Sequence, residues 1–154
     1  MSDATAAPVP VPVIDALNAL LEAEQSSLFR FVGEGSPYLS KATADVRRPL
    51  AGMVASNAAN VQTLADLIER AGGVPSGRRT VGEEQFLAYL SLKFLLPKLV
   101  EAKELMARRY ENAAKSIGPL APADVRQALQ DITAQHRADL QVLEQATAHV
   151  LSAK

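Results

Sequence analysis

Six polar residues of types that carry chemistry interrupt the apolar patterns of this chain: Glu24, Asn57, Asn60, Lys103, His136 and Asp139. Carboxylates and imidazole are ligands of divalent metal ions, whereas an ammonium group offers three hydrogen-bond donors and no lone pair. The set could therefore form either a metal site or a closed network of hydrogen bonds and ion pairs. Each residue lies near the middle of a segment with helical periodicity.

Four long segments carry apolar residues at alternating spacings of three and four, which predicts helices. They run from about Val13 to Val32, from Pro37 to Ala71, from Val81 to Ile117 and from Pro122 to Leu151. Long helices with narrow apolar stripes favour an all-α fold, a four-helix bundle. Since mid-helix positions meet at similar depth in a bundle, we expect the six polar side chains to converge in one buried layer.

Proline and glycine set the expected limits of these elements. Residues 1–12 are small, polar and interrupted by proline, which predicts a disordered tail before a bundle over residues 13–152. Gly72-Gly73 predicts a left-handed stop to the second helix. Pro49 lies inside the second helix and predicts a kink or a break there, and Pro97 predicts a local kink in the third.

The composition excludes several classes of function. The chain has 154 residues, of which 48% are apolar, and this allows one domain with a sizeable core. It has no cysteine, which excludes disulfides, thiolate metal sites and cysteine nucleophiles. A net charge of −1 gives no reason to expect nucleic acid or an anionic membrane as a partner. The N-terminus has no signal-peptide pattern and no apolar run approaches the ~20 residues of a membrane span, so we expect a cytoplasmic protein.

The cost of burial restricts what the polar layer can be. A buried polar group without a partner costs about 1–3 kcal/mol, and an unpaired charge costs more. Six such groups would threaten a fold whose net stability is about 5–15 kcal/mol. They must therefore satisfy one another or bind something. The layer has a charge of −1 with neutral His136 and no net charge with the imidazolium, so it can close without a ligand.

The pattern resembles the ferritin-like superfamily, of the bacterioferritin and rubrerythrin kind, over residues 14–151. "LNALLEAEQSSLFRF" is similar to the family's first helix, "LADLIERAGGVP" to the exit from its second, and "HRADLQVLE" to its final motif. The resemblance implies a four-helix bundle with a crossover between the second and third helices. It also implies two metal ions, held by a Glu from each of two helices and a Glu-x-x-His pair from each of the other two.

Of the six ligand positions that the resemblance implies, only Glu24 keeps its type. The other five are amides on the second helix, a cation on the third, and a His and an Asp on the fourth (Asn57, Asn60, Lys103, His136, Asp139). A di-iron pair needs several anionic oxygens and neutral imidazoles. The resemblance therefore implies a bundle that has lost its di-iron ligands.

We predict from this a protein without enzyme activity or cofactor, with a binding or structural role. Lys103 is expected to act as a built-in cation paired with Glu24 and Asp139, while the two Asn residues and His136 fill the remaining hydrogen bonds. Lys103 could instead extend outward along a groove. A buried lysine can form Schiff bases, which would suggest catalysis. Nothing in the sequence marks a substrate pocket, so the sequence gives little support for an enzyme.

An alternative is a metal-binding protein or oxidoreductase with one Fe, Mn or Zn ion at Glu24, His136 and Asp139. A rotation of the third helix that turned Glu101 or Glu104 inward would favour such a site.

A second apolar row on the third helix predicts a partner surface. Leu87, Leu90 and Phe94 lie off the bundle stripe in "FLAYLSLKFLL", residues 86–96. An apolar surface of this width needs a cover. We expect a second copy of the chain to provide it, which gives a homodimer.

Overall fold

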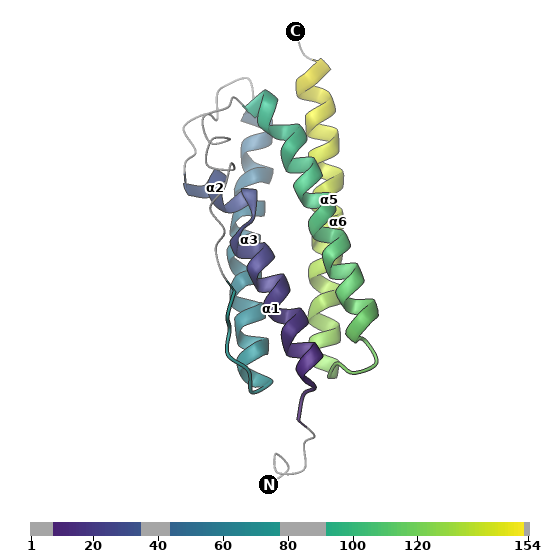
Figure 1. Cartoon of the computed structure of the whole chain (residues 1–154). Coiled ribbons are helices and arrows are strands. Elements are labelled where there is room, and N and C mark those ends of the chain that lie inside the picture. Colours follow the sequence, from purple (N-terminus) through teal and green to yellow (C-terminus); the bar gives the residue numbers. More distant parts are fainter. Residues whose placement is uncertain (1–7, 35–43, 78–91, 153–154) are drawn as a thin grey trace.

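The computed structural model of the chain describes residues 8–34, 44–77 and 92–152 (Figure 1). Within these ranges the regular structure is entirely helical. The helices are α1 (Val11–Gln25), α2 (Leu28–Glu34), α3 (Ala44–Arg70), α5 (Leu92–Ile117) and α6 (Ala123–Ser152). The predicted all-α class is thereby confirmed, and four long helical segments pack together, the first of them divided into α1 and α2.

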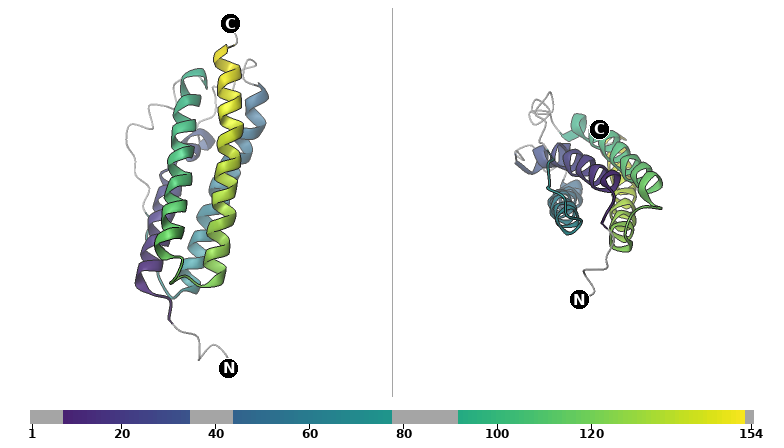
Figure 2. Two further views of the ribbon diagram at one scale, coloured as in Figure 1. Left: turned by 90° about the vertical axis from the view of Figure 1, so that its right-hand side faces the viewer. Right: turned by 60° about the horizontal axis from the view of Figure 1, so that its bottom comes forward.

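The most extensive helix contacts are those of α5 with α6 and of α1 with α3. The right-hand view of Figure 2 shows these two pairs on opposite sides of the molecule. In Figure 1, α1 and α6 run upward, whereas α3 and α5 both run downward. None of the described helices has the length and apolar character required to span a membrane.

Two apolar clusters form the core, one toward each end of the bundle. The lower cluster includes Leu17 of α1, Leu64 of α3 and Leu129 of α6. The upper cluster includes Leu50 of α3 and Leu96 of α5. On every long helix the predicted polar positions fall between the residues of the two clusters, so the polar layer separates one apolar core from the other.

The first helix is not continuous, contrary to the prediction of one helix over about Val13–Val32. It ends at Gln25, and α2 begins at Leu28. The Ser27 hydroxyl accepts a hydrogen bond from the Phe29 N–H at 3.1 Å and so caps α2. The Glu24 carbonyl, at the last turn of α1, accepts the Ser27 N–H at 3.2 Å and the Asn57 side-chain amide at 2.9 Å. A side chain of α3 therefore binds the backbone where the helix breaks.

The other helix ends are close to prediction where the structure describes them. The α3 helix ends as expected, because Gly72 has φ 89° and the N–H groups of Gly72 and Gly73 reach back to the Glu69 and Ile68 carbonyls. Of the kink or break predicted at Pro49, the break does not occur. Both α3 and α5 continue through their internal prolines, each of which removes only one hydrogen bond from a long packed helix.

The start of α1 at Val11 is two residues before the predicted start, so the tail is shorter than expected. Residues 1–7 of that tail lie outside the described residues, as do residues 35–43 and residues 78–91. The last range includes the predicted start of the third helix at Val81, and Leu87 and Leu90 of the predicted partner surface. Phe94, the third residue of the predicted partner surface, is 66% exposed.

Candidate functional site

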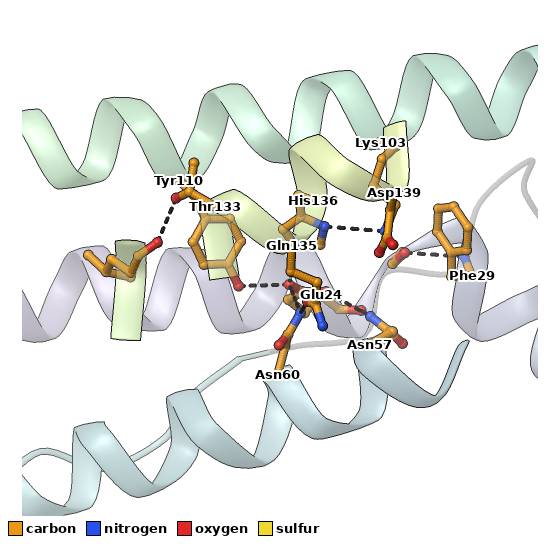
Figure 3. Close-up of polar contacts among 12 residues, drawn as sticks. Glu24, Phe29, Asn57, Asn60, Lys103, Tyr110, Thr133, Gln135, His136 and Asp139 are labelled. Atoms are coloured by element: carbon orange, nitrogen blue, oxygen red, sulfur yellow. Dashed lines mark hydrogen bonds and ion pairs between the residues drawn. The ribbon is translucent and has the colours of Figure 1, made fainter. Parts of the chain in front are cut away.

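The Glu24 carboxylate is the centre of the polar layer and is only 1% exposed (Figure 3). Its Oε1 accepts the Asn57 amide at 2.9 Å. Its Oε2 lies 3.1 Å from the Asn60 amide, 2.7 Å from the Tyr110 hydroxyl and 2.9 Å from His136 Nε2. A carboxylate has about four acceptor positions, and protein donors from three other helices supply the same number of contacts.

These donors stabilise the charged form of Glu24. Burial by itself raises the pKa of this carboxyl group. The contact with His136, followed by the hydrogen bonds of Tyr110 and Asn57, outweighs the burial and leaves the pKa of Glu24 below its usual value. A buried carboxylate is therefore kept ionised by its neighbours.

His136 connects Glu24 to Lys103. The Nδ1 atom of this imidazole lies 3.2 Å from Lys103 Nζ, and its Nε2 atom faces Glu24. Because an ammonium group can only donate, Nδ1 must accept from Lys103 while the lysine is charged. A neutral imidazole has one N–H, which is then on Nε2 and is donated to the carboxylate. The contacts thus assign the tautomer of His136.

Lys103 is 3% exposed and has few strong partners. Apart from His136, its Nζ lies 3.6 Å from Asp139 Oδ2 and 4.2 Å from the centre of the Phe29 ring. The first distance exceeds that of a good charge-assisted hydrogen bond, and the second is a cation–π contact. Burial lowers the pKa of Lys103, although Asp139 and Glu24 oppose this shift.

The predicted direct pairing of Lys103 with Glu24 is wrong, because the imidazole of His136 lies between the two groups. Asp139 is also less central than predicted, since its side chain is 22% exposed, unlike those of the other five residues. Its Oδ2 atom is buried and has no hydrogen-bond partner within the 3.5 Å limit among the described residues. Among the described residues, Asp139 is therefore held by a long ion pair to Lys103.

The sequence interpretation missed two polar members of the network. The Tyr110 hydroxyl donates to Glu24, and burial raises the pKa of Tyr110 well above the usual value. Gln135 accepts from the Asn60 amide at 3.1 Å. The spacing of seven between Lys103 and Tyr110, two helical turns on one face, was the available signal for Tyr110.

A cleft of about 700 Å³ leads to this network from outside. One wall comes from α1, the break after it and α2, and the other wall comes from α5. Glu24, Asn57, Lys103 and His136 lie among its lining residues. A small molecule in the cleft would therefore meet the buried polar groups directly.

The orientation of α5 decides between the sequence alternatives for Lys103. Lys103 points inward, so the alternative in which it extends to solvent is wrong. Glu101 is exposed, and Glu104 forms a surface pair with Arg108 at 2.8 Å. The rotation that would have brought either acid into the layer does not occur.

The metal ligands of the alternative interpretation do not form a shared site. Within the three described ranges, no group of three or more His, Cys, Asp or Glu side chains has the arrangement to hold an ion. Glu24 and His136 are in contact, but Nε2 of His136 points its proton at the carboxylate and Nδ1 faces the ammonium group of Lys103. Neither ring nitrogen offers a free lone pair while Lys103 is charged.

Comparison of the chain with family models, with curated proteins and with solved structures finds no match in any of the three.

Proposed function

We propose that this protein is a metal-free bundle with the ferritin-like arrangement, in which a hydrogen-bonded network replaces the metal pair and the adjoining cleft binds a small molecule without turnover. The observation that carries the proposal is that four protein donors contact the oxygens of the Glu24 carboxylate at hydrogen-bond distance. The one ligand position retained in type is thus already satisfied by side chains, and its neighbour His136 is paired on both ring nitrogens.

The directions of the helices support the ferritin-like part of the proposal. Because α3 and α5 run the same way, the chain must return along the length of the bundle between them. The segment between Arg70 and Leu92 is the proposed crossover. The self-association of such bundles, with Phe94 in the contact, and a cytoplasmic location are further parts of the same proposal.

The binding role is supported by the position of the cleft. A purely structural network would be stable behind a closed wall, whereas here a cleft of about 700 Å³ leads to it. This volume lies within the range of small-molecule sites, about 300–1,000 Å³. The apolar side chains of Leu28, Phe29 and Met106 beside a few buried polar groups match the usual composition of such sites.

Metal analysis of protein purified without chelator tests the proposal. We expect well under one Fe, Mn or Zn ion per chain, and no change in melting temperature when EDTA is added. Stoichiometric metal in the wild type, lost in the Asp139→Ala and His136→Ala variants, would support the alternative of a single ion at Glu24, His136 and Asp139. Mutation of exposed His149 provides the control for adventitious binding through histidine.

A further inference from the structure

We propose that Lys103 is a covalent attachment site for small, uncharged aldehydes or ketones, which enter the cleft and form an imine with its Nζ atom. The proposal rests on the proposed binding function, because it names the chemical class of the ligand in the same cleft. It follows from three observations: the access to Lys103, the groups that contact its nitrogen, and the charges around the entrance.

The cleft gives a ligand access to a lysine that solvent barely reaches. Lys103 lines the cleft although the residue is 3% exposed. Ala19, Ala23 and Ala102 in the walls leave room beside it, and the ring of Phe29 lies against its nitrogen. A carbonyl compound with a short apolar body can therefore contact the amine while its chain packs on apolar side chains.

The contacts of Lys103 are those of an activated nucleophile. Its Nζ lies 3.2 Å from His136 Nδ1, and His136 Nε2 lies 2.9 Å from Glu24 Oε2. A nucleophile, a base and a third group that orients the base form the arrangement that activates weak nucleophiles in enzymes. Glu24 is itself fixed by Asn57, Asn60 and Tyr110, so the base is held in one orientation. Burial, which lowers the pKa of Lys103, favours the neutral amine that the reaction needs.

The entrance favours an uncharged ligand. Lys98 and Arg109 line the cleft together with Glu22 and Glu101, and all four are exposed. Two positive and two negative side chains cancel, so the entrance has no net attraction for either sign of charge. Inside, the polar layer already has a charge of −1 with neutral His136, which disfavours a ligand carboxylate.

The covalent step balances without any further reactant. The Nδ1 atom of His136 takes a proton from the Lys103 ammonium group, and the amine adds to the carbonyl carbon, whose π electrons pass to oxygen. After the adduct rearranges its proton from nitrogen to oxygen, the imidazolium returns its proton to the leaving hydroxyl. Water departs as the C=N bond forms. The product is a protonated imine, which keeps one positive charge opposite Asp139.

The test labels the full-length protein with butanal and sodium cyanoborohydride, which reduces an imine to a stable secondary amine. Digestion and mass spectrometry then give the labelled fraction at each lysine. Lys98, exposed and on the same helix, is the internal control. At neutral pH and low aldehyde we expect labelling at Lys103 to exceed that at Lys98 by about tenfold or more, a threshold below the roughly 100-fold that a positioned base supplies at its lower limit. Equal or weaker labelling at Lys103 would overturn the proposal.

Two variants separate activation from accessibility. His136→Gln should slow labelling of Lys103 about tenfold at neutral pH, and the deficit should narrow as pH rises, because hydroxide then removes the proton that the imidazole accepts. An unchanged rate and pH profile would contradict the role of His136. Lys115→Arg, at an exposed position of α5 outside the cleft, should leave labelling of Lys103 intact. Denaturant should abolish the preference for Lys103 in the wild type, a measurement that needs no variant to fold.

The failure of this proposal is distinct from failure of the proposed function. Absence of preferential labelling, with metal analysis still giving well under one ion per chain, would exclude carbonyl ligands and leave the metal-free binding bundle in place. Stoichiometric metal would contradict the proposed function whatever the labelling result.

Discussion

His136 Nδ1 lies 3.2 Å from Lys103 Nζ, so an imidazole separates the buried cation from the buried carboxylate of Glu24. The charges at the two ends of this chain of contacts are coupled through the ring of His136. Removal of any one of the three groups leaves another without its partner inside the bundle.

Replacement of Lys103 by alanine is expected to destabilise the protein by about 3 kcal/mol or more, the effect of breaking a buried ion pair. The loss removes the donor to His136 and the only cation near Asp139 among the described residues. Urea unfolding at neutral pH measures it. Lys98→Ala, at an exposed position of the same helix, should change stability by less than about 0.5 kcal/mol. Equal effects of the two substitutions would contradict the buried role of Lys103.

Removal of the Tyr110 hydroxyl should reduce the stability that the ionised Glu24 carboxylate contributes to the folded state. The pKa of Glu24 is held below its usual 4.5 in the folded state, so its contribution is complete above that pH and is lost as pH falls through the folded value. Tyr110→Phe removes one of the hydrogen bonds that lower this pKa. We expect a loss of about 1.5–3 kcal/mol at pH 7 and a smaller difference from wild type below the folded pKa. Unfolding curves between pH 7 and 3 test this, and a constant difference would contradict it.

Above neutral pH, the change in the free energy of unfolding with pH depends on Lys103. Its pKa is lowered from 10.5 by burial, so between the folded value and 10.5 the unfolded chain binds more protons than the folded one. The free energy of unfolding therefore gains a contribution that increases with pH in this window. Lys103→Met removes the titrating group, so the free energy of unfolding of wild type should rise relative to that of this variant as pH increases toward 10.5. Parallel stability curves would be inconsistent with the lowered pKa.

A single change of charge should create dependence on metal ions. Lys103→Glu places a third carboxyl group beside Glu24 and Asp139 and frees a nitrogen of His136, so the variant should be destabilised without metal. Zn²⁺ or Co²⁺ at 100 times its dissociation constant should restore about 2.7 kcal/mol, a gain absent from wild type. Thermal unfolding with and without the ion measures the difference. Lys98→Glu is the matched control, and an equal response in it would indicate surface binding.

The break between α1 and α2 should be sensitive to its cap. Ser27→Ala removes the acceptor of the Phe29 N–H and is expected to cost about 1 kcal/mol. Because Phe29 covers the nitrogen of Lys103, the same variant should also increase exchange of the α2 amides with solvent. Hydrogen exchange compared with Ser116→Ala, at an exposed position on α5, tests this. Unchanged protection in α2 would show that the cap does not hold the helix.

The sequence by itself determined the class of the fold and which residues are withdrawn from water. Apolar residues at alternating spacings of three and four fix which face of a helix is buried, because the direction of each side chain follows from helical geometry. For this reason the inward positions of Glu24, Asn57, Asn60, Lys103 and His136 could be predicted from spacing alone.

The tertiary structure decided which of these groups touch. Periodicity places a side chain on a face, but the axial offset and tilt between helices, set by packing across the whole bundle, decide whether two groups lie 3 or 6 Å apart. Only the assembled helices place His136 between Lys103 and Glu24 and bring Tyr110 to the carboxylate. The break at Ser27 and the cleft beside it also arise from contacts between helices, which no single segment encodes.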